Sequence, residues 1–391
     1  MGDHYDVTVV GGGPAGSVAA RSLATAGYSV ALLEKQRFPR ETLCGEFLSA
    51  EVAQTISQMG LEREFQALRP NPLKTFTLLP DRSRPIASSL GFTAHGVKRG
   101  AFDAMLLEAA GRAGVTIFQP AEVTGIERDQ QEFVVAYNDR GEARACRSPW
   151  VIGAYGKGSP LDKRLGRPFA GTRTGYTGFK YHIPAGMIEN LGNDEIVIAL
   201  GPRMYCGISR VGGETINLCA LARREKGDVS SRERLGELAR ANPSFARLVT
   251  PAVLSALADL SPYGTGNLFF GPRDPVENGI LMAGDSAGLI APLAGDGIGI
   301  AMQQGRLIGR LFAELNPRPE ERESFYETYR RESARLFSPR KRIALLCQRI
   351  ALSEAMRLAA TPVLALAPGL LRAAVRETRG RVEHQHIPEF T

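Results

Sequence analysis

The chain has 391 residues, of which 43% are hydrophobic and 23% are charged. This length and composition allow a large core, favour two packed domains and exclude an intrinsically disordered chain. The net charge of +7 is carried by 40 arginines and 8 lysines that are scattered along the sequence. Because no run of basic residues alternates with aromatic residues, we expect no nucleic-acid partner.

Five cysteines stand at irregular spacings, at positions 44, 146, 206, 219 and 347, with no C-x-x-C pair. An odd number in this pattern argues against a disulfide framework or a zinc site, so we expect no metal and a reducing compartment. We also expect no signal peptide, and no stretch of 18 apolar residues is present in this sequence. The sequence therefore predicts a cytoplasmic protein without a spanning helix.

The first forty residues predict a strand, a helix and a second strand. Residues 5–10 are typical of a buried parallel strand, residues 14–26 have helical apolar spacing, and residues 29–34 form the next strand. Such a βαβ unit places its first turn, rich in glycine, at the carboxyl end of the first strand. This is where nucleotide phosphates bind in folds of this kind.

Each glycine of that turn has a predicted role. We expect Gly11 to allow the tight turn, Gly13 to let the backbone approach a pyrophosphate, and Gly16 to let the helix pack on the strand. Pro14 and Ala15 begin the helix, whose unpaired N–H groups would face the phosphates.

An acidic residue follows at the expected distance. Glu34 ends the second strand, 23 positions after Gly11, where it would accept hydrogen bonds from a ribose 2′-hydroxyl. A 2′-phosphate would be repelled there, so the pattern favours FAD or NAD over NADP. Lys35 follows it directly and is included in the predicted cofactor site.

A second glycine-rich segment lies roughly 270 residues later. A strand over residues 279–283 leads to Gly284 and Asp285. The loop 292–299 then leads into a helix predicted over residues 298–314, with its N–H groups towards the cofactor. The candidate residues in this loop are Pro292, Gly295, Gly297 and Ile298. Two such segments indicate one dinucleotide held between the two ends of the sequence.

Glu34-Lys35, a short linker and Cys44-Gly45-Glu46 resemble FAD-dependent oxidoreductases of the geranylgeranyl reductase and p-hydroxybenzoate hydroxylase superfamily. The resemblance implies that Arg40 lies along the ribose or phosphates of FAD. It places Cys44 near the flavin ring, as in the reductase branch, and Gly45 is included in the predicted cofactor site.

The resemblance extends to two further segments. Arg99 begins an element similar to the R-x-x-F-D of that superfamily, in which the arginine approaches the flavin. The acid of this element, Asp103, has an ordinary alternative as a partner for the helix dipole. By the same resemblance, Asp285 binds a ribitol hydroxyl of FAD.

The resemblance implies an α/β fold with a Rossmann-like FAD-binding domain, an interleaved antiparallel-sheet substrate domain and a helical C-terminus. We assign residues 1–70, 97–165 and 271–315 to the FAD-binding domain, 71–96 and 166–270 to the substrate domain, and 316–391 to the helical region. Strands are expected near residues 114–118, 132–138 and 143–153, with a meander after the first. Residues 165–270 alternate short strands and turns.

Two segments depart from the superfamily pattern. Tyr155 stands where most members carry the aspartate of Ala-Asp-Gly, which weakens the expected route from NADH or NADPH. Residues 205–210 lack the aromatic motifs that reductases and halogenases carry there. Tyr205 and Cys44 are our candidate catalytic residues, although each has an equal alternative as a core residue.

The C-terminal region is helical in pattern and contains an apolar run, residues 359–371, with arginines on both sides. A helix on a membrane surface and a helix that caps a substrate pocket would both have this pattern. Either alternative indicates a hydrophobic substrate. The pair His384 and His386 is too isolated to indicate a metal site.

These observations predict an FAD-dependent oxidoreductase with NADH or NADPH as electron donor. The first hypothesis is a monooxygenase that uses O2 to hydroxylate a hydrophobic substrate, which would be phenolic, polyketide-derived or lipid-like. One alternative is a reductase of isoprenoid double bonds. Another is a flavoprotein that acts on or with a partner protein.

Overall fold

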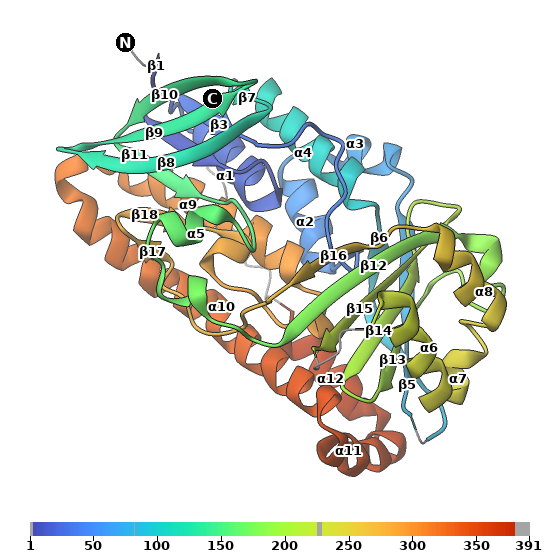
Figure 1. Ribbon diagram of the computed structural model, residues 1–391. Coiled ribbons are helices and arrows are strands. Elements are labelled where there is room, and N and C mark those ends of the chain that lie inside the picture. The colour runs from blue at the N-terminus through green and yellow to red at the C-terminus, as the bar shows by residue number, and fades with distance from the viewer. Residues whose placement is uncertain (1–2, 82, 225–228, 380–391) are drawn as a thin grey trace.

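The computed structural model describes residues 3–81, 83–224 and 229–379, in which helices pack around three sheets (Figure 1). His384 and His386 lie outside the described residues. The predicted α/β class with a helical C-terminus is confirmed.

The first sheet has six strands and carries the glycine-rich turns. Its order is β17 (Val276–Glu277), β18 (Ile280–Met282), β11 (Trp150–Gly153), β2 (Val7–Val10), β3 (Val30–Leu33) and β7 (Thr116–Phe118). All neighbours are parallel except β17 and β18. Because β18 lies beside β11, and β11 beside β2, strands from both ends of the sequence end at the same edge.

Two helices, α1 (Pro14–Thr25) and α9 (Gly297–Leu315), cover one face of this sheet. They lie close to each other because small residues at their contact let the two backbones approach. A methyl group added at Gly305 would lie 2.6 Å from the carbonyl oxygen of Ala15. One added at Gly309 would lie 2.2 Å from Cβ of Ser22. The predicted helices 14–26 and 298–314 are thus confirmed, each within one residue.

The second sheet is the predicted meander. It has the order β1 (Asp3–His4), β10 (Glu142–Ser148), β9 (Glu132–Asp139) and β8 (Ala121–Asp129), and β8, β9 and β10 are antiparallel. The single strand expected over 143–153 is wrong, because it is two strands, β10 and β11, in different sheets. Pro149, which separates them, has no N–H to continue a ladder.

The third sheet has eight strands, and most of its neighbouring strands are antiparallel. Its order is β16 (Tyr263–Gly266), β12 (Tyr176–Pro184), β15 (Thr215–Arg223), β14 (Met204–Arg210), β13 (Glu195–Gly201), β5 (Asn71–Leu79), β6 (Ile86–Gly96) and β4 (Phe47–Leu48). Only β13 and β5 are parallel among these pairs. Except for β4, its strands come from the segments 71–96 and 166–270.

Four helices lie around the first sheet: α2 (Ala50–Gln58), α3 (Glu62–Ala67), α4 (Arg99–Arg112) and α5 (Pro160–Arg164). Three others, on the third sheet, interrupt the region 165–270 that we expected to hold only strands and turns: α6 (Ser231–Ala241), α7 (Pro243–Ala246) and α8 (Pro251–Ala256). The expectation for 165–270 is therefore wrong over 231–256. Ser230 and Glu233 form a reciprocal cap at the start of α6, and Leu235 and Leu238 are buried against the sheet.

Three C-terminal helices complete the fold: α10 (Arg322–Leu352), α11 (Glu354–Leu366) and α12 (Pro368–Glu377). The long helix α10 runs along one side of the molecule from the first sheet to α11 and α12 below the third sheet (Figure 1). No single described helix is long and apolar enough to cross a membrane. The helices α11 and α12, which are bent by 112° relative to each other, are long and apolar enough only when they are counted together, and this criterion considers length and composition alone.

Candidate functional site

One continuous cavity of about 710 Å3 connects the glycine-rich turns with the third sheet. Its wall contains Gly11, Gly13, Pro14, Ala15, Glu34, Lys35, Arg40, Cys44, Gly45, Arg99, Tyr205, Gly284, Asp285, Pro292, Gly295, Gly297 and Ile298. Of the candidate site residues, only Gly16 does not line the cavity. The structure thus brings together residues that are far apart in the sequence.

The first glycine turn is packed on one side and open on the other. Gly11 has φ +107°, and a methyl group there would lie 2.4 Å from the carbonyl oxygen of Ala154. One at Gly16 would lie 1.9 Å from the carbonyl oxygen of Gly11. One at Gly13 would meet only a guanidinium nitrogen of Arg40, at 3.7 Å. The open backbone at Gly13, at the N-terminus of α1, therefore fits a pyrophosphate.

Glu34 is buried at the cavity wall, and backbone amides hold its carboxylate. Oε2 accepts a hydrogen bond from the N–H of Gly12 at 2.8 Å, and Oε1 accepts one from Gln36 at 2.8 Å. A carboxylate has about four acceptor positions, so it retains capacity for a ribose hydroxyl. Its position and charge agree with the predicted preference for FAD or NAD.

Asp103 organises the two arginines of the predicted site. Its side chain is fully buried, accepts two hydrogen bonds of 2.8 Å from Arg99 and lies 3.3 Å from Nη1 of Arg40. Arg40 is also 3.9 Å from Glu34 and adjacent to Gly13. Asp103 is therefore more than a partner for the helix dipole, because it anchors both guanidinium groups.

The second glycine segment touches the first. Gly284 has φ +63°, and a methyl group there would lie 3.1 Å from Cβ of Ala15. The N–H of Gly284 donates to Oε1 of the buried Gln304 at 2.8 Å. The chain therefore closes on itself here, and Asp285 projects from the junction at the cavity wall.

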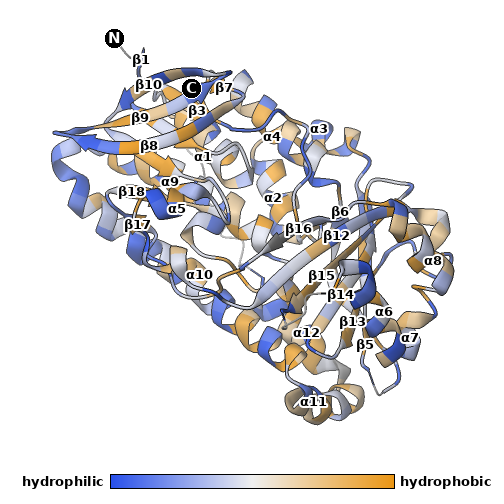
Figure 2. Ribbon diagram, in the orientation of Figure 1, coloured by the Kyte–Doolittle hydropathy of each residue, from blue (hydrophilic) through white to orange (hydrophobic). Residues whose placement is uncertain are grey.

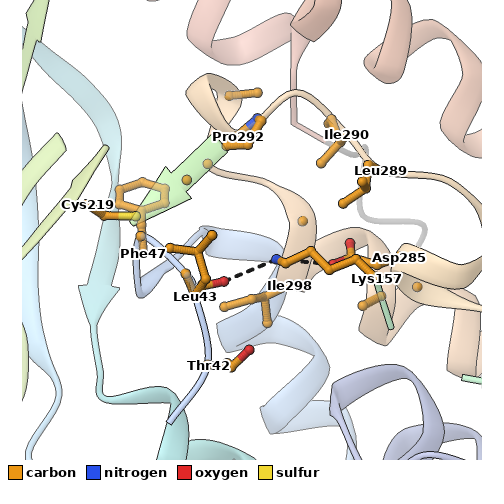
Figure 3. A pocket seen from close by; sticks show the side chains of 18 of the residues that line it. Thr42, Leu43, Phe47, Lys157, Cys219, Asp285, Leu289, Ile290, Pro292 and Ile298 are labelled. Carbon is orange, nitrogen blue, oxygen red and sulfur yellow. Dashed lines mark hydrogen bonds and ion pairs between the residues drawn. The ribbon is translucent and has the colours of Figure 1, made fainter. Parts of the chain in front are cut away.

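Lys157 is a cavity residue that our sequence reasoning missed. Its ammonium group lies 3.5 Å from Asp285 and donates to the carbonyl oxygen of Leu43 at 3.1 Å (Figure 3). It thereby links the Cys44 segment to the second glycine segment. The only sequence signal was its place in the unusual run that follows Tyr155.

The loop 292–299 is fastened to the C-terminal helices by buried charges. Asp296, which precedes α9, forms an ion pair with Arg340 of α10, and Arg379 donates to the carbonyl oxygen of Ala294 at 2.8 Å. Burial raises the pKa of Asp296 to about 7, a shift that the nearby charge of Glu51 reinforces and that Arg340 and Arg379 oppose. Arg379 reaches this loop from beyond the end of α12, a contact that no sequence pattern indicated.

A buried cluster lies behind Cys44 and Gly45. Glu46 has φ +56° and accepts hydrogen bonds from Lys180 at 2.8 Å and from the N–H of Arg99 at 2.9 Å. Its other oxygen contacts His182 at 2.5 Å, and Lys180 also donates to Glu41 at 2.7 Å. The three potential ligands Glu41, Glu46 and His182 lie close together. The ammonium group of Lys180 already supplies the positive charge between the two carboxylates.

Cys44 and Tyr205, the two candidate catalytic residues, differ in their surroundings. The thiol of Cys44 accepts a hydrogen bond from the N–H of Glu46 at 3.3 Å and lies on the cavity wall. Tyr205 is buried and donates to Oε1 of Gln348 at 3.3 Å, and burial raises its pKa well above the ordinary value. Because this phenol ionises poorly, Tyr205 is better suited to form part of the cavity wall than to transfer protons.

Tyr155 lines the cavity, but its hydroxyl belongs to a buried polar network. Its hydroxyl lies 3.1 Å from Asp162 and 3.0 Å from Arg167, and Arg167 also pairs with Glu277. Burial raises the pKa of Tyr155. The hydroxyl is thus committed to holding α5 against the first sheet.

The cavity is aliphatic beyond the loop 292–299. Its wall there is made by residues of β5, β6, β13 and β14 on one side and of α10, α11 and α12 on the other, among them Leu78, Ile198, Leu200, Ile350, Leu364 and Leu371. The helices α11 and α12 therefore cap the cavity, which was one of the two alternatives for the apolar C-terminal run.

Three comparisons agree with this geometry. A family model described as an FAD binding domain matches residues 4–193. The chain is 26% identical over 346 residues to digeranylgeranylglycerophospholipid reductase 1 of Methanococcoides burtonii, covering 84% of this chain and 79% of the relative.

Two solved structures share the fold over nearly the whole chain. A geranylgeranyl bacteriochlorophyll reductase-like protein of Thermoplasma acidophilum has a TM-score of 0.76 at 19% identity, covering 97% of this chain and 96% of that one. The p-nitrophenol 4-monooxygenase of Pseudomonas putida has a TM-score of 0.72 at 15% identity, covering 98% and 100%.

Proposed function

Since this chain belongs to the FAD-dependent oxidoreductases of the geranylgeranyl reductase and p-hydroxybenzoate hydroxylase superfamily, we propose that it reduces a carbon–carbon double bond in a long aliphatic, isoprenoid-like substrate. NADH or NADPH would be the electron donor. The cofactor would lie between Glu34 and Ile298, and the substrate in the aliphatic part of the same cavity.

The aliphatic wall is the observation that carries this proposal. Leu78, Ile198 and Leu200 of the third sheet line a space that is continuous with the cofactor end, and so do Leu364 of α11 and Leu371 of α12. Burial of each methylene contributes about 0.8 kcal/mol, so a long hydrocarbon chain would bind such a space well. A small polar ring would bury less apolar surface there.

The residues around Gly13 and Asp285 would hold FAD. Arg40 and the N-terminus of α1 would bind the pyrophosphate, Glu34 the ribose, and Asp285 the ribitol chain. When bound and reduced, FAD supplies hydride to the substrate. The chain itself would contribute orientation and an apolar environment, because residues of α11 and α12 form part of the aliphatic wall.

The proposal is tested with the purified holoprotein under anaerobic conditions. Reduced holoprotein is mixed with an isoprenoid alcohol, and flavin absorbance and product mass are followed. We expect reoxidation of the flavin together with a mass gain of two hydrogens in the product. Reoxidation that needs O2, with one oxygen atom gained by the substrate, would refute reduction.

Hydroxylation of a hydrophobic substrate is the second candidate, and the segment 204–210 favours it. This strand, β14, lines the cavity with Tyr205, Gly207 and Ser209, and it lacks the aromatic motif of the reductases. Substrate-dependent O2 consumption in the same assay supports this candidate. A third candidate, action on or with a partner protein, predicts a stable complex and no turnover of small hydrophobic compounds.

A further inference from the structure

The helices α11 and α12 carry a second apolar surface, on the side that faces away from the cavity. Four large side chains that do not line the cavity are exposed there: Met356, Leu358, Leu366 and Leu370. Leu366 is 89% exposed, and the others are between 42% and 50% exposed. We call these four residues the apolar cap surface. Figure 2 shows hydrophobic residues along both helices, at the end of the molecule remote from the N-terminus.

The same two helices line the cavity with their inner side. Leu364 and Leu371 belong to the cavity wall, whereas Leu366 and Leu370 are exposed close to them in sequence. Only a layer one helix thick therefore separates the aliphatic cavity from the apolar cap surface. This continuity argues for an occupant that is itself aliphatic.

Positive charges accompany this surface. Arg349, Arg372 and Arg376 are exposed on α10 and α12, against the exposed acids Glu354 and Glu377. Arg342 is a further exposed arginine on α10. An apolar helix surface with exposed arginines complements the anionic headgroups and acyl chains of a bilayer surface.

The geometry fits a helix that lies on a bilayer and does not cross it. At 1.5 Å per residue, the 13 residues of α11 span about 20 Å, less than the roughly 30 Å of a hydrocarbon core. Arg357 holds α11 to the protein, because its buried guanidinium pairs with Asp81 at 2.7 Å. The 112° bend to α12 keeps both helices at one end of the molecule.

We propose that the apolar cap surface docks on anionic lipid bilayers, so that a lipid-like substrate enters the cavity between α11 and α12 without passing through water. The docking part stands on the exposed surface alone. The entry part rests on the proposed function.

Docking is tested by flotation of FAD-loaded protein with vesicles and without any substrate. One set of vesicles is phosphatidylcholine alone, and the other also contains anionic phosphatidylglycerol. We expect flotation with the anionic vesicles that weakens as salt is added, because salt screens the arginines. Failure to float with either set would overturn the proposal.

Variants identify the surface that binds. Leu366→Glu is expected to reduce vesicle affinity at least about 10-fold, because a buried leucine contributes that much or more to partition. Leu260→Glu is the control, since Leu260 is also an exposed leucine and lies far from α11 and α12 in the sequence. FAD absorbance and melting temperature check that both variants fold. Equal flotation of both variants would overturn the proposal.

Two other occupants give different results. If a second copy covers this surface, the protein sediments as a dimer that Leu366→Glu dissociates, and vesicles do not bind. If residues 380–391 cover it, a chain ending at residue 379 floats and the full chain does not. Either result overturns docking by the full chain, while the anaerobic reductase assay in detergent remains a separate test of the proposed function.

Discussion

The ammonium group of Lys180 and a carboxylate oxygen of Glu46 lie 2.8 Å apart, and neither side chain is exposed to solvent. Burial alone would raise the pKa of Glu46, but His182 and Lys180 outweigh it and lower that pKa. Burial would lower the pKa of Lys180, but Glu46 and Glu41 raise it. Each buried charge therefore depends on its partners, and the Lys180–Glu46 pair is the contact that both charges share.

Removing one charge of the Lys180–Glu46 pair should lower the free energy of unfolding much more than removing both charges. We expect Lys180→Met to lower the free energy of unfolding by about 3–5 kcal/mol, because it leaves Glu46 as a poorly compensated buried charge. The double variant Lys180→Met/Glu46→Gln should recover most of this loss. Urea unfolding measures both, with the exposed Lys163→Met as control. A double variant as unstable as the single one would contradict the pairing.

Alanine substitutions at two glycines of the same turn should impair the protein in different ways. Gly16→Ala should destabilise the protein even without FAD, by about 3 kcal/mol or more, because the methyl group meets a backbone carbonyl at 1.9 Å. Gly13→Ala should fold normally but bind FAD at least about 10-fold more weakly, because its methyl group would occupy the pyrophosphate position.

Melting of the FAD-free protein and FAD titration separate the two effects. Gly186→Ala is the control, because a methyl group there meets no atom within 4 Å. Normal FAD affinity in Gly13→Ala would show that the pyrophosphate lies elsewhere.

Asp296 should make stability depend on pH in the acidic to neutral range. Burial raises the pKa of this carboxyl to about 7 in the folded protein, against an ordinary value of 3.8. Between these values the folded state holds a proton that the unfolded state has lost. Stability therefore falls as pH rises from about 4 to about 7, by at most about 1.4 kcal/mol per pH unit.

Asp296→Asn removes this titration. We expect its melting temperature to change less with pH than that of the unaltered protein over the same range, both measured without FAD. The charged groups that face Asp296 are Arg340, Arg379 and Glu51, so Arg340→Gln should raise the carboxyl pKa further. Identical pH profiles for Asp296→Asn and the unaltered protein would exclude the proposed titration.

Tyr155→Phe should affect stability but not electron transfer. It removes contacts of the hydroxyl with Asp162 and Arg167, which costs about 1–3 kcal/mol for hydrogen bonds to charged groups. Because this hydroxyl points into the Arg167 network, the rate of flavin reduction by NADH or NADPH should not change. Anaerobic stopped-flow mixing measures that rate. A large loss of rate with normal stability would place Tyr155 on the donor path.

Regular local patterns explain why much of the fold was predictable. The strand 7–10, the helix from Pro14 and the helix from Gly297 each have a hydrophobic period and a glycine or proline boundary. The break at Pro149 and the helices after Ser230 were missed, although their cap and proline signals were present in the sequence. In both places the neighbouring segments have strand patterns, and we extended the strand prediction across them.

The roles of individual charged residues in the site were harder to predict from the sequence. Lys157 and Lys180 are single charges without a motif, and each gains its role from a partner far away in the sequence. Asp103 belongs to the R-x-x-F-D element, but that element does not indicate Arg40 as a partner. Asp103 pairs with Arg40 as well as with its helix neighbour Arg99. Such pairs depend on which elements pack together, and this information is absent from any local window.

The sequence by itself determined the two glycine segments, the acid that follows the second strand and therefore the dinucleotide-binding character of the chain, because those residues act through backbone geometry that neighbouring residues specify. Only the tertiary structure decided that α11 and α12 close an aliphatic cavity, that Arg379 fastens the loop 292–299 and that Lys180 balances Glu46. Those contacts arise when distant segments are buried against each other, and burial makes unpaired charge and empty apolar space costly.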